Sequence, residues 1–194
     1  MVLNTATILT LFRIALIPVL VVVFYLPYWW ANWAATLVFI LAGVTDWADG
    51  YIARKYNQYS RFGEFLDPVA DKLMVAVTLV LVIQYRPTAW LVIPAAIIIG
   101  REITISALRE WMAQIGERAS VKVALLGKLK TGFQMTSLGF LLFREDIGPF
   151  PIFDIGHVGL IAAAVLTMWS MIQYLRAAWP IMKNSSQASD KSID

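Results

Sequence analysis

The chain has 194 residues, of which 59% are hydrophobic and 15% are charged, and its formal net charge is +3. Soluble domains are roughly half apolar and a quarter charged, so this composition favours a membrane protein and argues against a soluble one. Cysteine is absent and there is a single histidine, which excludes disulfides, thiolate metal sites and histidine-rich zinc sites. A metal ion bound by this chain would therefore have oxygen ligands.

Six predominantly apolar segments approach the roughly 20 residues that a helix needs to cross a bilayer. In chain order they cover residues 8–26, 31–52, 65–85, 89–112, 125–143 and 158–181. We therefore predict an all-α, polytopic membrane protein with six transmembrane helices. One domain is expected over residues 1–183, followed by a polar tail at 184–194 whose composition is typical of disorder.

Basic residues gather in the loops after the second and fourth segments and near the C-terminus, whereas the remaining loops carry few of them. Cytoplasmic loops of membrane proteins are enriched in lysine and arginine. We therefore expect both termini and these two loops to lie on the cytoplasmic side of the membrane.

Four carboxylates interrupt the apolar pattern of the second and third segments. Asp46 and Asp49 lie near the end of the second segment, and Asp67 and Asp71 lie near the start of the third. A carboxylate at the bilayer centre costs roughly 2.5–3.5 kcal/mol, so such residues usually face a cavity and mark a functional path. The alternative is that they are interfacial charges that reach water, which their regular spacing disfavours.

The spacing of these acids predicts that they converge. Residues three or four apart lie on one face of a helix, and the connection between the two helices is short enough for antiparallel packing. Four carboxylates at one point repel one another unless cations lie between them. Oxygen ligands suit magnesium, manganese or calcium, and four acids are enough for two ions about 3.5–4 Å apart, an arrangement used for displacement at phosphorus.

Small residues accompany the acids. Gly50 and Ala53 follow the pair in the second segment, and Gly63 precedes the pair in the third. Small residues in membrane helices commonly permit close helix packing. Beside carboxylates they can instead leave room for a nucleotide, with Arg54 placed to meet a phosphate. The residue pattern alone leaves both interpretations open.

Together these residues form a fixed pattern that resembles, without a mismatch, the signature of the CDP-alcohol phosphatidyltransferase family. The pattern is Asp46-x2-Asp49-Gly50-x2-Ala53-Arg54-x8-Gly63-x3-Asp67-x3-Asp71. The resemblance covers nearly all of the chain except the polar tail. Residues 4–18, which include Thr10 and Arg13, and residues 101–113 and 127–131 are similar to the branch of the family that uses glycerol 3-phosphate as the acceptor.

The resemblance implies transfer of the phosphatidyl group from CDP-diacylglycerol to glycerol 3-phosphate, with release of CMP. It implies two Mg²⁺ or Mn²⁺ ions per site and a homodimer in the bacterial inner membrane, with an active site open to the cytoplasm and no nucleic-acid partner. Asp46, Asp49 and Asp67 match the family's metal ligands, and Asp71 matches its general base, which can also contact the second ion. The residues implied for CDP binding are Asp46, Gly50, Ala53, Arg54 and Gly63.

An anionic acceptor needs positive charge beyond the metal ions. Arg101 ends a long apolar run, and Arg109 lies eight residues further along the same predicted helix, about 80° around it at 3.6 residues per turn. Guanidinium groups match the geometry of phosphate. Lys128 and Lys130 are further candidates for acceptor binding. The alternative is that these four residues set the topology or pair with neighbouring acids such as Glu102.

Other functions stay open on this evidence. Within the family, the acceptor can instead be inositol phosphate, serine or phosphatidylglycerol. Intramembrane prenyltransferases also combine aspartate-rich motifs with magnesium, but their motifs usually occupy two well-separated loops. A divalent-cation transporter would use the acids as an ion path. Transporters place such sites near the bilayer midplane, often in repeated halves, whereas this chain shows no internal repeat.

Overall fold

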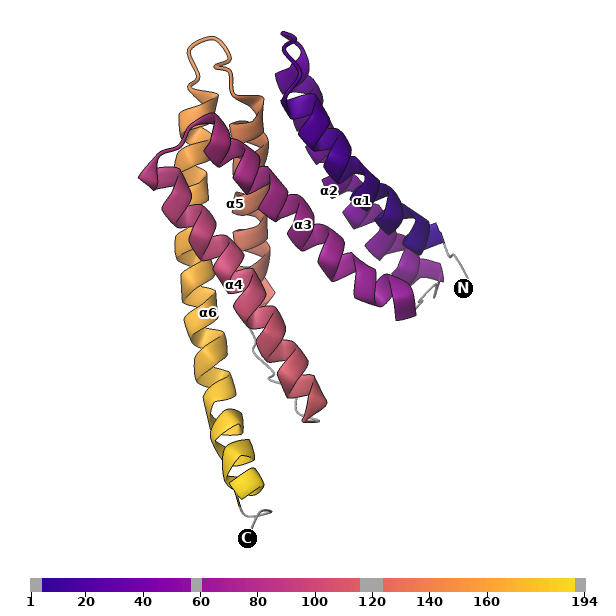
Figure 1. The fold of residues 1–194 in the computed structure, drawn as a ribbon, viewed down its shortest axis with the longest axis vertical. Helices are drawn as coiled ribbons and strands as arrows, with labels where there is room; N and C mark the ends of the chain where they lie inside the picture. The colour runs from indigo at the N-terminus through magenta and orange to yellow at the C-terminus, as the bar shows by residue number, and fades with distance from the viewer. Residues whose placement is uncertain (1–4, 57–60, 116–123, 191–194) are drawn as a thin grey trace. The chain divides into compact units, whose positions relative to one another are not determined.

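The computed structural model describes residues 5–56, 61–115 and 124–190. Within these residues the chain forms six helices and no strand (Figure 1). The helices are α1 (Thr5–Phe24), α2 (Ala31–Tyr56), α3 (Arg61–Tyr85), α4 (Ala89–Gln114), α5 (Ala124–Phe143) and α6 (Ile152–Asp190). The all-α prediction is confirmed, and each predicted span coincides largely with one helix.

Proline positions account for several helix ends. Proline cannot donate the helical hydrogen bond and disfavours helix at the preceding residue, and Pro27 and Pro87 follow shortly after α1 and α3 end. α6 begins directly after Pro151 and continues to Asp190. It therefore includes residues 184–190, which the sequence analysis placed in a polar tail, whereas residues 191–194 lie outside the described part.

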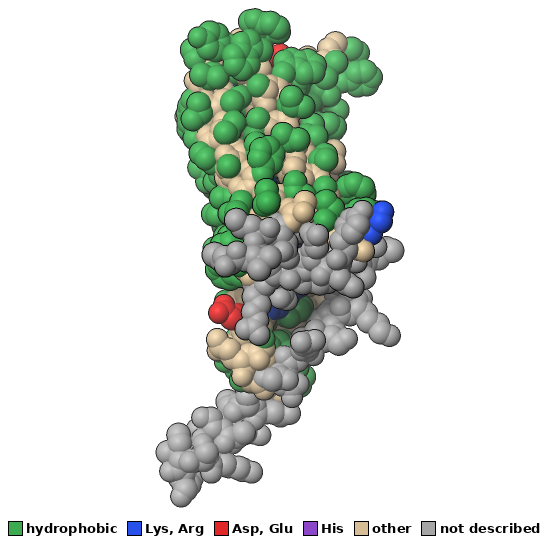
Figure 2. Space-filling view, turned by 90° about the vertical axis from the view of Figure 1, so that its right-hand side faces the viewer, with side chains coloured by type: hydrophobic (Ala, Val, Ile, Leu, Met, Phe, Trp, Pro, Cys, Tyr) green, Lys and Arg blue, Asp and Glu red, His purple; other side chains and the backbone are tan. Residues whose placement is uncertain are grey.

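Four of the helices are long and apolar enough to cross a membrane, as expected for a membrane-embedded protein. The candidate spans are Thr7–Phe24, Ala31–Ile52, Ala89–Gln114 and Ile152–Ile181. Apolar side chains cover much of the surface that Figure 2 shows, and such a surface needs a cover other than water. α3 carries charged residues in its first turn and α5 carries two lysines within its first two turns, and the topology of six spans stays a prediction.

The chain groups into two compact units. The first contains Met1–Thr88 and Thr136–Val158, and the second contains Ala89–Met135 and Gly159–Asp194. Thus α1, α2 and α3 belong to the first unit and α4 to the second, whereas α5 and α6 contribute to both. The assignment of residues 1–183 to a single domain stays a prediction.

In the first unit, α1 packs against both α2 and α3 (Figure 1). Its buried residues recur every three or four positions, as expected for one face of a helix. In chain order they are Thr7, Thr10, Arg13, Leu16, Leu20 and Phe24. The buried face of α1 is therefore polar along its first half and apolar along its second half.

The buried face of α2 includes a carboxylate. Its members, again three or four residues apart, are Ala31, Ala35, Phe39, Ala42, Thr45 and Asp49. Alanines on such a face let a neighbouring helix approach closely. The Thr45 hydroxyl donates a 2.8 Å hydrogen bond to the Ala42 carbonyl oxygen and so needs no partner on another helix. Asp49 is then the polar group of this face that requires a partner from elsewhere.

Arg144, which directly follows α5, joins the C-terminal ends of α1 and α3. Its Nη2 atom donates a 3.5 Å hydrogen bond to the Phe24 carbonyl oxygen. Its guanidinium lies 4.2 Å from the centroid of the Phe24 ring and 5.2 Å from that of Tyr85. Phe24 is about 16 Å from Arg13 along the helix axis at 1.5 Å per residue. The polar and apolar halves of α1 are thus held at separate ends of the first unit.

Candidate active site

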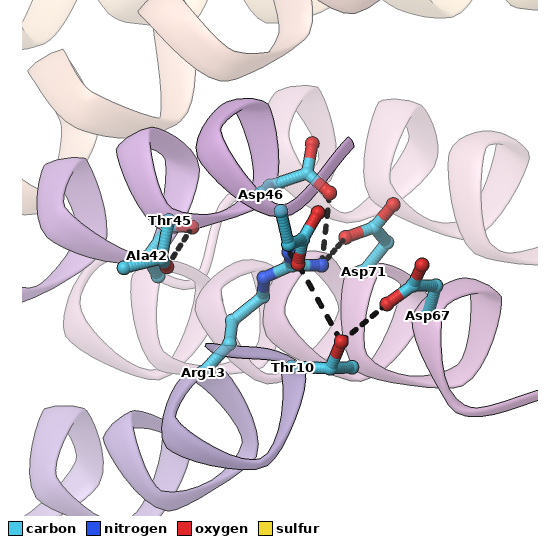
Figure 3. Close-up of polar contacts among 8 residues, drawn as sticks. Thr10, Arg13, Ala42, Thr45, Asp46, Asp67 and Asp71 are labelled. Atoms are coloured by element: carbon cyan, nitrogen blue, oxygen red, sulfur yellow. Dashed lines mark hydrogen bonds and ion pairs between the residues drawn. The ribbon is translucent and has the colours of Figure 1, made fainter. Parts of the chain in front are cut away.

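Arg13 on α1 reaches into a group of carboxylates from α2 and α3 (Figure 3). Its Nη1 atom lies 2.9 Å from Asp46 Oδ1 and 2.5 Å from Asp71 Oδ1, and its Nη2 atom forms an ion pair with Asp49. The Arg13 side chain is only 1% exposed. Burying a charge is unfavourable unless it is paired, and here three acidic partners offset that cost. One guanidinium therefore joins Asp46, Asp49 and Asp71.

Thr10 binds the fourth carboxylate. Its hydroxyl donates a 2.5 Å hydrogen bond to Asp67 Oδ1 and lies 3.5 Å from Asp49 Oδ2. Thr10 precedes Arg13 by three residues, so both side chains project from the same face of α1. The structure thus brings the four predicted acids together, and the contacts that join them run through α1, a helix to which the spacing argument assigned no role.

The carboxylate cluster, meaning Asp46, Asp49, Asp67 and Asp71, is closed on one side and open on another. The Asp49 side chain is 3% exposed, whereas those of Asp46 and Asp71 are 47% and 50% exposed. Arg13 and Asp49 form the closed side. A ligand can therefore reach Asp46 and Asp71 without the displacement of a helix.

The chemistry of the cluster suits an oxygen-ligated divalent cation, because it combines four carboxylates with the Thr10 hydroxyl. In the part of the chain that is described, however, no three acidic, histidine or cysteine side chains already form a group that could hold an ion. Arg13 stands where Asp46, Asp49 and Asp71 approach one another. The residues fit Mg²⁺ or Mn²⁺ by donor type.

The residues predicted to bind CDP are only partly described. Gly63 is buried near the start of α3, and Gly50 is half-buried beside Asp49. Ala53 and Arg54 belong to α2, but their side chains lie outside the described part of the structure. The assignment of these residues to nucleotide binding stays a prediction.

Two of the predicted acceptor residues meet in a second polar cluster, which lies in the second unit. Arg101 Nη1 donates a 3.0 Å hydrogen bond to Glu102 Oε1, and Arg101 Nη2 donates one of 3.3 Å to Ser170 Oγ. Lys130 Nζ donates to the same Glu102 oxygen at 2.5 Å. Two cations share one carboxylate, so this basic cluster keeps a net positive charge. That charge and the Arg101 guanidinium match an anion such as phosphate.

A third predicted acceptor residue, Arg109, contacts an aromatic ring of α6. The Arg109 guanidinium lies 5.4 Å from the centroid of the Tyr174 ring, a cation–π contact, and its side chain is exposed. The side chain of Lys128 lies outside the described residues. The pairing of Arg101 with Glu102, which the sequence analysis considered as the alternative, is present.

Four residues that contact the predicted ones were not themselves predicted as site residues: Thr10, Arg13, Glu102 and Ser170. A signal for Arg13 exists, because it is the only charged residue in the sequence of α1. A single arginine in an apolar span requires an anionic partner inside the protein, and Thr10 lies on the same face. Nothing in the sequence separates Glu102 from an ordinary acidic neighbour of Arg101.

The family model for CDP-alcohol phosphatidyltransferases matches residues 3–171, which include every residue of the carboxylate and basic clusters. The chain belongs to the CDP-alcohol phosphatidyltransferase family. The family prediction made from the aspartate motif is therefore confirmed.

The chain is also similar to bacterial proteins that are named CDP-diacylglycerol–glycerol-3-phosphate 3-phosphatidyltransferase. Those of Escherichia coli strain K12 and Shigella flexneri serotype 5b are each 54% identical to it over 175 residues. The protein of Pectobacterium atrosepticum is 57% identical over 175 residues. In all three cases the alignment covers 90% of this chain and 94% of the relative.

Proposed function

We propose that this protein transfers the phosphatidyl group of CDP-diacylglycerol to glycerol 3-phosphate, giving phosphatidylglycerophosphate and CMP. The observation that carries the proposal is the convergence of Asp46, Asp49 and Asp71 on Arg13, with Asp67 held by Thr10. This cluster belongs to a chain of the CDP-alcohol phosphatidyltransferase family. The names of relatives that align with 90% of the chain support glycerol 3-phosphate as the acceptor.

In this proposal the carboxylate cluster holds two Mg²⁺ or Mn²⁺ ions, with Asp46, Asp49, Asp67 and Asp71 as ligands. When bound, such ions neutralise the pyrophosphate and the charge that develops on the departing CMP. The half-exposed positions of Asp46 and Asp71 support access for an anionic substrate. Gly50, Ala53 and Gly63 are assigned to the nucleotide pocket and Arg54 to its phosphates.

Asp71 is assigned as the general base. Its carboxylate takes the proton from the attacking hydroxyl of glycerol 3-phosphate. The hydroxyl oxygen then forms a bond to the phosphorus that carries diacylglycerol, and the bond from this phosphorus to the oxygen of CMP breaks. A single displacement needs no covalent enzyme intermediate, and the sequence has no cysteine to form a thiol-linked one.

The basic cluster is assigned to the phosphate of the acceptor. Arg101 and Lys130 are 12% and 7% exposed and share Glu102, so an incoming phosphate would meet cations that are already oriented. Arg109 and Lys128 are assigned to the same task on the basis of the family resemblance. Charge-assisted contacts of this kind are stronger than neutral hydrogen bonds.

The remaining parts of the proposal concern the setting of the enzyme. We assign it to the bacterial inner membrane as a homodimer with six spans per subunit. Both termini and the active site face the cytoplasm. The distribution of lysine and arginine among the loops and the four apolar helices support the membrane location and orientation, whereas the homodimer rests on the family resemblance. The acyl chains of CDP-diacylglycerol would then stay in the bilayer while its head group reaches the carboxylates.

A purified-enzyme assay tests this function. The full chain in detergent is supplied with CDP-diacylglycerol and, separately, glycerol 3-phosphate, inositol phosphate, serine and phosphatidylglycerol, and CMP release and lipid products are measured with Mg²⁺, Mn²⁺ or EDTA. We expect product with glycerol 3-phosphate and loss of activity in EDTA. Product with another acceptor alone would reassign the acceptor. Metal-ion flux into vesicles without CMP release would favour a transporter.

A further inference from the structure

Arg13 is placed where a cation is expected. Its Nη1 atom contacts Asp46 and Asp71, and its Nη2 atom contacts Asp49, so the guanidinium occupies the point at which these carboxylates meet. If the same three carboxylates also held a divalent ion, Arg13 and that ion would compete for them.

The burial of Arg13 also affects the strength of its ion pairs with the carboxylates. Its side chain is 1% exposed and that of Asp49 is 3% exposed, so solvent screens this ion pair weakly, whereas the half-exposed Asp46 and Asp71 are screened more. Without Arg13, the carboxylate cluster would hold four like charges with mutual repulsion and no internal cation from this position. Within the described residues, Arg13 Nε is buried and has no hydrogen-bond partner. The guanidinium is thus held by its two terminal nitrogen atoms, and both are bound to the carboxylates.

We propose that Arg13 is an internal counter-cation that competes with the divalent metal ion. It holds Asp46, Asp49 and Asp71 together, and metal binding would require it to release part of these contacts. This inference rests on the proposed metal-dependent function. It assigns Arg13 a positioning role, since the residue acts on the carboxylates, and it makes the metal affinity of the site lower than the carboxylates alone would give.

Direct Mn²⁺ binding tests the competition. Full-length protein in detergent is stripped with EDTA and desalted, and free Mn²⁺ is followed by electron paramagnetic resonance during titration of the wild type, Arg13→Gln and Arg13→Lys. In the wild type, Mn²⁺ binding has to break ion pairs of Arg13, which is costly. Arg13→Gln has no such pairs to break, so we expect its dissociation constant for Mn²⁺ to be about tenfold lower, or lower still. Arg13→Lys keeps the positive charge but loses the paired nitrogen atoms of the guanidinium. Its dissociation constant for Mn²⁺ should lie between those of the wild type and Arg13→Gln.

Arg86→Gln is the matched control. It removes the same charge from the same unit, but Arg86 is 60% exposed and its acidic neighbour is Asp154, at 3.9 Å. Its Mn²⁺ affinity should equal that of the wild type. Thermal unfolding gives a second readout that does not depend on activity. In EDTA, Arg13→Gln should unfold at a lower temperature than the wild type, and added Mn²⁺ should raise that temperature by more than it does in the wild type.

Each outcome has a defined meaning. Equal or weaker Mn²⁺ binding by Arg13→Gln overturns the competition while leaving the metal-dependent function intact. If Arg13→Gln does not fold, Arg13→Lys decides, and binding no tighter than that of the wild type overturns the proposal. An absence of Mn²⁺ binding in the wild type and in both variants overturns the competition and the metal requirement together. Binding by the variants alone supports the competition in its strongest form.

Discussion

Thr10 donates a 2.5 Å hydrogen bond to Asp67, and this contact ties the first helix of the chain to the start of the third. A carboxylate has two oxygen atoms and can turn about its side-chain bonds, so its direction depends on what it binds. Thr10 fixes one Asp67 oxygen toward α1, which leaves the other to face a ligand. A small uncharged side chain thus decides how one of the four acids is presented.

The first prediction concerns this hydrogen bond. Thr10→Val keeps the shape of the side chain but removes the donor, and hydrogen bonds to charged groups contribute roughly 1.5–3 kcal/mol. We expect kcat/KM to fall by about tenfold to a hundredfold, while Thr10→Ser retains most activity. Thr78→Val is the control, because the buried Thr78 hydroxyl donates to Met74 O of its own helix at 2.8 Å. Equal losses in both valine variants would contradict the orienting role of Thr10.

The second prediction concerns the base. Asp71→Asn keeps the size and one acceptor oxygen but cannot take up a proton at neutral pH, so turnover should fall to background. Binding of CDP-diacylglycerol, measured by the protection it gives against thermal unfolding, should stay close to that of the wild type. The exposed Asp154→Asn serves as the control and should keep full activity. Turnover by Asp71→Asn at the wild-type rate would remove Asp71 from this role.

The third prediction separates substrate binding from topology in the basic cluster. Arg101→Ala removes a guanidinium that is 12% exposed, and a charged hydrogen bond to phosphate is worth roughly 1.5–3 kcal/mol. The KM for glycerol 3-phosphate should therefore rise about tenfold or more, with little change in the KM for CDP-diacylglycerol. Lys130→Met should show the same selectivity.

The control for this prediction is Arg86→Ala, because Arg86 is exposed and lies outside the basic cluster. It should leave both KM values unchanged. If Arg101→Ala instead raises both KM values equally, or changes neither while lowering the amount of inserted protein, Arg101 serves topology or folding and the acceptor phosphate binds elsewhere.

The fourth prediction concerns helix packing. A Cβ atom on Gly156 would lie 2.9 Å from Phe140 Cβ, 3.0 Å from the Ser137 carbonyl oxygen and 3.1 Å from Leu141 Cγ. Overpacking of this kind costs roughly 1–3 kcal/mol, so Gly156→Ala should lower the melting temperature by about 3–10 °C. Gly139→Ala, with nothing within 4 Å of the added atom, should keep or raise it. Equal melting temperatures would contradict the close approach at Gly156.

The helices and the convergence of the four acids could be predicted from the sequence. Apolar runs of the length of a bilayer have few folded forms other than helices, and their bounds are close to those observed. Four acids interrupt the apolar pattern of the second and third segments: Asp46, Asp49, Asp67 and Asp71. Within each segment they are three or four residues apart, so the sequence of these two segments was enough to predict that the acids converge. The family signature then fixed the chemistry to which they belong.

The partners of the acids were harder to predict. Arg13 contacts the acids only if α1 is rotated about its axis so that this side chain faces the protein and not the lipid. That rotation is determined by the packing of α1 against α2 and α3. The buried face of α1 was nevertheless encoded, since Thr10, Arg13 and Leu16 are spaced by three. The pairing of Glu102 with Lys130 was unpredictable for another reason: the two residues are 28 positions apart, and no local pattern predicts such a pair.

The burial of Arg13 has a consequence for how the chain is made. α1 leaves the ribosome before α2 and α3, so Asp49 follows Arg13 by 36 residues and Asp71 follows it by 58. Until then the arginine has no carboxylate to meet, and its place in a bilayer is unfavourable by roughly 2.5–3.5 kcal/mol at the centre. The first span should therefore settle in its final depth only after the third has been synthesised, so that insertion and assembly of these three helices form one coupled event.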